Sequence, residues 1–104
     1  MLPIARVMTR EGDQQELERQ YQMVAGRMNE LPLADGLLAH IALRRPNGVE
    51  VINIWESLEQ SRAAFERPEF QAALREAGMS PDDMQPEDVE VLFAPARADR
   101  EGKD

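Results

Sequence analysis

No cysteine and only one histidine occur among the 104 residues of the chain. The absence of cysteine excludes disulfide bonds, a thiolate nucleophile and a metal held by cysteine ligands. With a single histidine, a zinc site would have to rest on carboxylates, so we expect no bound metal. The glycines are isolated, which excludes a glycine-rich phosphate loop, and no serine stands in a nucleophile-elbow pattern. Metal, phosphate-loop and serine-nucleophile chemistry are therefore not expected.

Basic residues are scarce, with 12 Lys and Arg against 20 Asp and Glu, and the formal net charge is −8. A nucleic-acid partner needs a basic face that releases counterions, and an anionic membrane surface would repel this chain. No segment approaches the roughly 20 apolar residues of a membrane span. The N-terminal residues lack the apolar core and cleavage site of a signal peptide. We therefore expect a cytoplasmic protein with no nucleic-acid or membrane partner.

The length suits one domain, and an apolar fraction of 42% suits a globular fold. A domain of this size buries only about 60–65% of the surface of its unfolded chain, so a partner subunit would add stability. We expect the domain to span residues 1–96. The polar segment 97–104 has no apolar pattern and is expected to be a disordered tail.

Alternating apolar and polar residues predict strands at 3–9, 36–45, 49–55 and 89–94, with a turn at 10–13. Apolar residues at intervals of three and four predict a helix over 14–29. Asp13 and Ser57 are expected to cap this helix and the one after the third strand. Pro68 either kinks that second helix or starts a new one, and Gly78 ends it. This order predicts an α+β, ferredoxin-like β-α-β-β-α-β fold with a four-stranded antiparallel sheet and both helices on one face.

The second predicted strand is apolar on both of its faces. One face is expected to carry Leu37, Ala39, Ile41 and Leu43, and the other Leu38, His40 and Ala42. Helices on one side of the sheet would leave the other apolar face uncovered. We therefore expect a homodimer in which two sheets cover one another.

The turn between the second and third strands decides whether the only histidine and the only tryptophan share a face. Asn47-Gly48 favours a type I′ hairpin turn, which would place His40 directly opposite Trp55. A shift of two residues would place His40 opposite Asn53 instead. In both registers His40, Asn53 and Trp55 share a face, whereas an odd loop or a bulge would separate them. We expect a shared face.

These three side chains form the candidate site. His40 is a candidate base, Asn53 must find hydrogen-bond partners if it is buried, and Trp55 offers a stacking surface. Tyr21 and Met28, on the apolar side of the first helix, would line the same cavity if His40 faces the helices. A lone histidine on an apolar strand and a tryptophan at a strand end are also common structural residues, so core packing is the competing interpretation.

Arg6 is unusual because alternation places it on the same face as Ile4 and Met8. A charged side chain among apolar neighbours either pairs with an acid at the edge of the dimer or binds an anionic ligand. The sequence does not choose between these two roles.

The third predicted strand ends in a W-x-S step, formed by Trp55 and Ser57. The helix that follows contains Phe65, and a P-x-F segment comes after it at Pro68 and Phe70. In these features, concentrated in residues 36–74, the chain resembles the dimeric α/β-barrel proteins around the antibiotic-biosynthesis monooxygenases. The resemblance implies a dimeric α/β barrel. Family members include cofactor-free oxygenases of polycyclic phenols, quinol oxygenases, haem-degrading enzymes and small proteins without a known reaction.

The haem-degrading branch matches poorly. That branch has an asparagine in its first strand, a tryptophan before the second helix and a histidine ligand late in that helix, and of these only the tryptophan has a counterpart, Trp55. Here the first predicted strand has no asparagine, and Leu74 stands about where the histidine would fall. Haem degradation is therefore the least favoured of the activities that the resemblance implies.

The resemblance thus implies a cofactor-independent monooxygenase-like protein that acts on or binds a small hydrophobic phenol or quinol. His40 would be the base, Asn53 the oxyanion donor and Trp55 a wall of the cavity. Tyr21, Met28 and Phe65 would also line the cavity. The alternative is a non-enzymatic dimer of the same fold that binds a small molecule or serves as a scaffold. A closed cavity of roughly 300 Å³ or more at His40 would favour the first hypothesis.

Overall fold

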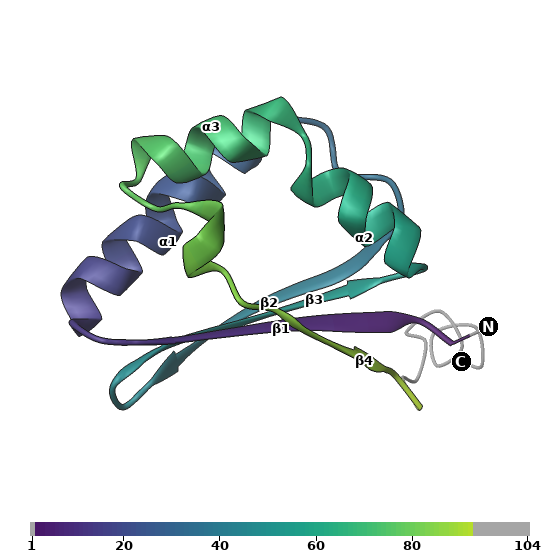
Figure 1. Cartoon of the computed structure of the whole chain (residues 1–104), viewed down its shortest axis with the longest axis horizontal. Coiled ribbons are helices and arrows are strands. Elements are labelled where there is room, and N and C mark those ends of the chain that lie inside the picture. Colours follow the sequence, from purple (N-terminus) through teal and green to yellow (C-terminus); the bar gives the residue numbers. More distant parts are fainter. Residues whose placement is uncertain (1, 93–104) are drawn as a thin grey trace, which may run out of the picture.

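The computed structural model describes residues 2–92 of the chain (Figure 1). A four-stranded antiparallel sheet has the strand order β2-β3-β1-β4. Three α-helices lie together on one face of this sheet. In chain order the elements are β1 (Ile4–Glu11), α1 (Gln14–Met28), β2 (Leu37–Arg45), β3 (Gly48–Trp55), α2 (Leu58–Phe65), α3 (Pro68–Glu76), the 3-10 turn η1 (Pro81–Asp83) and β4 (Glu87–Glu90). The predicted α+β, ferredoxin-like fold is therefore confirmed.

Both predicted helix caps are present. The side chain of Asp13 accepts a hydrogen bond from the backbone N–H of Glu16 at 2.9 Å. Ser57 Oγ accepts one from the backbone N–H of Gln60 at 3.2 Å. These bonds satisfy donors that the first turn of a helix leaves unpaired, so α1 and α2 begin where the sequence indicates. Within residues 2–92, no helix is long and apolar enough to cross a membrane.

Pro68 starts a new helix rather than kinking the old one. It occupies the first turn of α3, where its missing N–H costs nothing. Gly78 then takes a positive φ of 83°. Its N–H donates to the carbonyl of Arg75, and that of Met79 donates to Leu74, which closes α3. Arg67 is thereby held at the joint between α2 and α3.

The end of β1 and both ends of β4 differ most from the prediction, while the starts of β1, β2 and β3 each differ by one residue. β1 continues through Arg10 and Glu11, which were assigned to a turn, because both pair with the start of β3. β4 begins at Glu87, two residues before the predicted start at 89, and ends at Glu90, four residues before the predicted end at 94. The predicted strand residues 93–94 and the predicted tail 97–104 lie outside the described residues.

The predicted hairpin turn is wrong. Arg45 pairs with Gly48, so the turn is formed by Pro46 and Asn47. Among residues 2–92 only glycines have a positive φ, whereas a type I′ turn needs it at both central residues. Proline fixes φ near −65° and favours the first central position of an ordinary turn, so Pro46 determines this geometry. The register is the two-residue shift, which places His40 opposite Asn53.

A bulge near the start of β2 changes one predicted face. Leu37 pairs with Trp55 and Ala39 with Ile54, which leaves Leu38 as the extra residue. Leu37 therefore joins His40 on the helix side of the sheet, not the opposite side as predicted. The bulge precedes His40 in β2 and lies outside the segment from His40 to the turn, so His40 still pairs with Asn53.

The middle of the helix-free face of the sheet is apolar, with Glu87 and Glu50 at its margins. The register aligns Ile41, Ile52 and Val7 in one row, and Ala39, Ile54, Ala5 and Val89 in the next. Ile41 is 41% exposed and Val89 is 42% exposed. No helix of the described part covers this face (Figure 1).

Candidate functional site

A cavity of about 560 Å³ lies between the sheet and the helices. Its floor comes from β1, β2 and β3, and its walls from α1, α2, α3 and the loops after α1 and α3. All six residues singled out from the sequence line it, namely Tyr21, Met28, His40, Asn53, Trp55 and Phe65. The volume is within the range of small-molecule sites.

A row of polar side chains crosses the floor of the cavity. The strand register places His40 opposite Asn53, Asn53 opposite Arg6, and Arg6 opposite Asp88. This row therefore spans all four strands on the helix side. His40 and Trp55 share this face without being paired, since Trp55 lies opposite Leu37.

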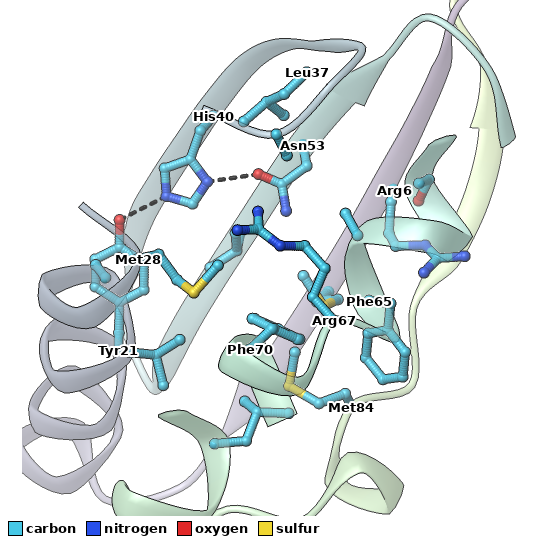
Figure 2. Close-up of a pocket in the computed structure, with 18 of the residues that line it drawn as sticks. Arg6, Tyr21, Met28, Leu37, His40, Asn53, Phe65, Arg67, Phe70 and Met84 are labelled. Atoms are coloured by element: carbon cyan, nitrogen blue, oxygen red, sulfur yellow. Dashed lines mark hydrogen bonds between the residues drawn. The ribbon is translucent and has the colours of Figure 1, made fainter. Parts of the chain in front are cut away.

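A chain of hydrogen bonds joins α1 to the hairpin. Tyr21 Oη lies 2.8 Å from His40 Nε2, and His40 Nδ1 lies 2.5 Å from Asn53 Oδ1 (Figure 2). An amide oxygen only accepts, so Asn53 fixes the proton of a neutral His40 on Nδ1. Nε2 is then an acceptor, and the Tyr21 hydroxyl donates to it. The rings of Tyr21 and His40 are also nearly parallel, at 5° and with centroids 5.9 Å apart.

This geometry changes the role expected of Asn53. Its oxygen orients His40, and its amide nitrogen is turned towards the interior of the cavity (Figure 2). His40 itself is exposed on the edge strand β2, so it lies at the mouth of the cavity and not in a closed interior. Asn53 is half-buried.

Burial raises the pKa of the Tyr21 phenol above its ordinary value. The phenol therefore keeps its proton near neutral pH. A protonated Tyr21 is the form that donates to Nε2, so the pKa shift and the hydrogen-bond pattern agree.

Arg6 pairs with an acid of its own chain. Its guanidinium donates to the two carboxylate oxygens of Asp88 on β4 at 2.8 and 3.1 Å. The same guanidinium keeps the pKa of Asp88 below its ordinary value. Arg6 also lies 6.0 Å from the ring centroid of Phe65. Of the two roles that the sequence left open, the structure describes acid pairing, within the chain.

The remaining walls are mostly apolar. Trp55 is buried at the end of β3, and Phe65 packs on Phe70 with centroids 5.6 Å apart and a 56° tilt. Met28 approaches from α1 and Met84 from the segment after η1 (Figure 2). An aromatic molecule would meet rings and thioethers on these sides.

Sequence reasoning missed Arg67. Its side chain lines the cavity and is 26% exposed, and Figure 2 shows its guanidinium reaching towards the amide of Asn53. The available signal was Pro68, which places Arg67 at a joint between helices. That signal does not reveal which side chains across the sheet Arg67 would face.

No family model and no curated protein matches the chain. Solved structures do match it. A candidate antibiotic biosynthesis monooxygenase from Chloroflexus aurantiacus is 10% identical, with 90% of this chain and 97% of that chain covered and a TM-score of 0.68. The chain has the antibiotic biosynthesis monooxygenase-like fold. SnoaB, a cofactor-independent oxygenase from Streptomyces nogalater, is 18% identical, with coverages of 91% and 93% and a TM-score of 0.53.

A haem-degrading protein from Mycobacterium tuberculosis also has this fold, at 17% identity, coverages of 91% and 97% and a TM-score of 0.64. The residues present here do not fit haem ligation. His40 is the only histidine, and both of its ring nitrogens are engaged, by Tyr21 and Asn53. Leu74 is buried in the core at 1% exposure.

Proposed function

We propose that the protein is a cofactor-independent monooxygenase-like protein that binds and oxidises a phenol- or quinol-type aromatic molecule beside the β2–β3 hairpin. The observation that carries the proposal is the Tyr21–His40–Asn53 hydrogen-bond chain at the mouth of a largely apolar cavity. The shared fold with a cofactor-independent oxygenase supports it.

The hydrogen-bond chain provides a route for a proton. The substrate hydroxyl gives its proton to Tyr21 Oη while Tyr21 gives its own to His40 Nε2. The resulting imidazolium keeps its Nδ1–H on Asn53 Oδ1, which holds the ring in place. Tyr21 would then touch the substrate, His40 would store the proton, and Asn53 would position His40.

The deprotonated aromatic ring supplies the reducing electrons. One oxygen atom of O₂ becomes a ring carbonyl, and the other leaves as water with the hydroxyl proton and the hydrogen of the oxidised carbon. A phenol and O₂ thereby give a quinone and water, so atoms and electrons balance without a further reductant. The contribution of the protein is positioning and proton transfer.

The apolar walls hold the ring. Trp55, Phe65 and Met28 offer a surface for stacking and contact with sulfur. Because His40 is exposed in the single chain, the bound aromatic molecule must itself displace water from the mouth. Water exclusion then accompanies binding.

The alternative is a non-enzymatic protein that binds a small hydrophobic molecule in the same cavity. The exposure of His40 favours this alternative, because a catalytic base usually lies where water is excluded. Haem degradation is a weaker candidate, because both ring nitrogens of the only histidine, His40, already form hydrogen bonds.

We also propose a homodimer formed through the helix-free face of the sheet by the domain at residues 1–96. The apolar residues of one row, Ile41, Ile52 and Val7, would be covered by the same residues of a second copy, with Glu87 of this row on the edge strand β4. An isologous pairing of this kind is the commonest way to cover an apolar face.

The test combines binding and turnover. Trp55 is the only tryptophan, so its emission reports on the cavity. A panel of naphthols, anthrones and quinols should include one class that quenches it saturably and consumes oxygen. General acid–base groups contribute about 10²- to 10⁴-fold, so His40→Ala should lose oxygen uptake by at least that lower factor. Tyr21→Phe should lose much of it, and Trp55→Phe should mainly weaken binding.

Gln22→Ala is the matched control, because Gln22 is exposed beside Tyr21 on α1 and does not line the cavity. It should keep full oxygen uptake. Undiminished uptake in His40→Ala would sink the assigned proton route. Saturable quenching with no uptake in the natural protein would favour the binding protein instead.

A further inference from the structure

The lining of the cavity has a charge opposite to that of the whole chain. The net charge is −8, yet among residues 2–92 the lining includes Arg6, Arg10 and Arg67 and no aspartate or glutamate. A positive lining in an acidic chain favours a ligand that carries negative charge. This feature is independent of the proton route described above.

Two of the three arginines already have close partners. Arg6 holds Asp88, and Arg10 Nη1 donates to Gln20 Oε1 at 2.6 Å. Arg67 differs, because the nearest described carboxylate, Glu69, is 3.9 Å from its Nε. That separation is too long for a hydrogen bond. Of the three arginines, Arg67 is thus the one whose guanidinium has no hydrogen-bond acceptor among the described residues.

The N–H donors of Asn53 and Arg67 face one another in the cavity (Figure 2). The amide nitrogen of Asn53 is turned towards the guanidinium, because its oxygen is held by His40 (Figure 2). The amide of Asn53 and the guanidinium of Arg67 therefore both offer N–H donors in one part of the cavity.

We propose that the ligand is a hydroxy-aromatic carboxylate whose carboxylate lies between Arg67 and the amide of Asn53. The planar guanidinium fork matches the two oxygens of a carboxylate, which a neutral phenol or quinol cannot match. The ring then fills the space bounded by Phe65, Phe70 and Trp55.

The two ends of the ligand have separate recognition groups. The carboxylate faces Arg67, and the ring hydroxyl faces Tyr21 at the mouth. The assignment of the hydroxyl rests on the proposed function, since it uses the same proton route. The assignment of the carboxylate does not depend on turnover and is tested by binding alone.

The experiment uses Trp55 quenching to compare three probes that share one ring system: a hydroxynaphthoate, the corresponding hydroxynaphthamide of the same size, and naphthol, which lacks the substituent. The natural protein should bind the carboxylate most tightly. Loss of a charge-assisted hydrogen-bonded pair corresponds to about 10- to 100-fold in affinity, so Arg67→Gln should weaken hydroxynaphthoate by that factor. It should change the affinity for the amide and for naphthol less than about twofold. Arg67→Lys, which keeps charge without the fork, should lie between.

Arg75→Gln is the matched control, because it removes the same charge from an exposed position of α3 that does not line the cavity. It should bind all three probes as the natural protein does. Equal losses for acid and amide in Arg67→Gln, or no preference for the acid in the natural protein, would overturn the carboxylate site.

The two proposals fail separately. Binding of the acid that depends on Arg67, without oxygen uptake, leaves this inference standing and removes the oxygenase. Oxygen uptake with neutral phenols, and no preference for the acid, does the reverse.

Discussion

Gly48 shows how one residue fixes the hairpin that carries the site. A Cβ built on Gly48 would overlap the carbonyl oxygen of Arg10 on the neighbouring strand β1. Relief would require the β1–β3 ladder to move apart, and overpacking of this kind costs about 1–3 kcal/mol. We expect Gly48→Ala to lower the free energy of unfolding by about that amount, measured by urea denaturation.

Gly26→Ala provides the comparison. Gly26 is exposed in α1, and a Cβ there meets nothing within 4 Å. Alanine is the better helix former by about 1 kcal/mol, so this variant should be more stable than the natural protein. Equal stability changes in the two variants would show that the close approach of β1 to Gly48 is not the controlling feature.

At the site itself, alternation along the strands placed His40, Asn53 and Trp55 on one face, and the structure agrees. The pairing partner of His40 was wrong because the turn forms at Pro46, a choice made by the φ of one residue. Arg67 was not predicted at all. Its place in the cavity depends on how the α2–α3 joint packs over the sheet, and no local pattern encodes that packing.

A cluster between α1 and the hairpin shows how whole elements are held together. Glu18 on α1 accepts two hydrogen bonds from Arg44 on β2, at 2.7 and 2.8 Å. Gln14 donates both to Glu18, at 2.6 Å, and to the carbonyl of Gly48, at 3.0 Å. This cluster ties the helix that carries Tyr21 to the strands that carry the rest of the site.

The cluster predicts a dependence of stability on pH. Hydrogen bonds from Arg44 and then from Gln14 lower the pKa of Glu18 to about 2. A carboxyl whose pKa is lower in the folded state stabilises the fold above its unfolded pKa of 4.5, and this contribution is lost as the pH falls towards about 2. The free energy of unfolding should therefore fall across that window, and the fall should be shallower in Glu18→Gln.

Glu56→Gln is the control for that measurement, since Glu56 is exposed and the described residues include no ion pair for it. Its profile should follow that of the natural protein. Identical acid profiles for Glu18→Gln and the natural protein would contradict the role of the cluster.

The ends of helices and strands were predicted well where nearby residues determine them, and less well where pairing between strands determines them. Asp13, Ser57, Pro68 and Gly78 act within a few residues of themselves, and each helix end that they determine was foreseen or left between two alternatives. The end of β1 depends on how far β3 runs beside it. That length is a property of the sheet, which the β1 sequence alone does not contain.

At the scale of the whole molecule, the two faces of the sheet have different partners. One face is covered by three helices that enclose the cavity, and the other presents Ile41, Val89 and their neighbours to solvent. A chain of this length buries a limited core, so covering that face would add substantially to its stability. The proposed dimer would also fix the edge strand β2, on which His40 lies.

Ile41→Glu tests the dimer at the β2 end of the row that also contains Ile52 and Val7. The natural protein should sediment at twice its 11.8 kDa chain mass. The variant should sediment as a monomer that keeps its helical circular dichroism, because a buried unpaired carboxylate is costly in an interface. Met23→Glu is the matched control, since Met23 on α1 is 37% exposed against 41% for Ile41 but lies away from the sheet. It should remain dimeric. A natural protein that sediments as a monomer, or dimers that persist in Ile41→Glu, would mean that the apolar face is not the interface between two copies.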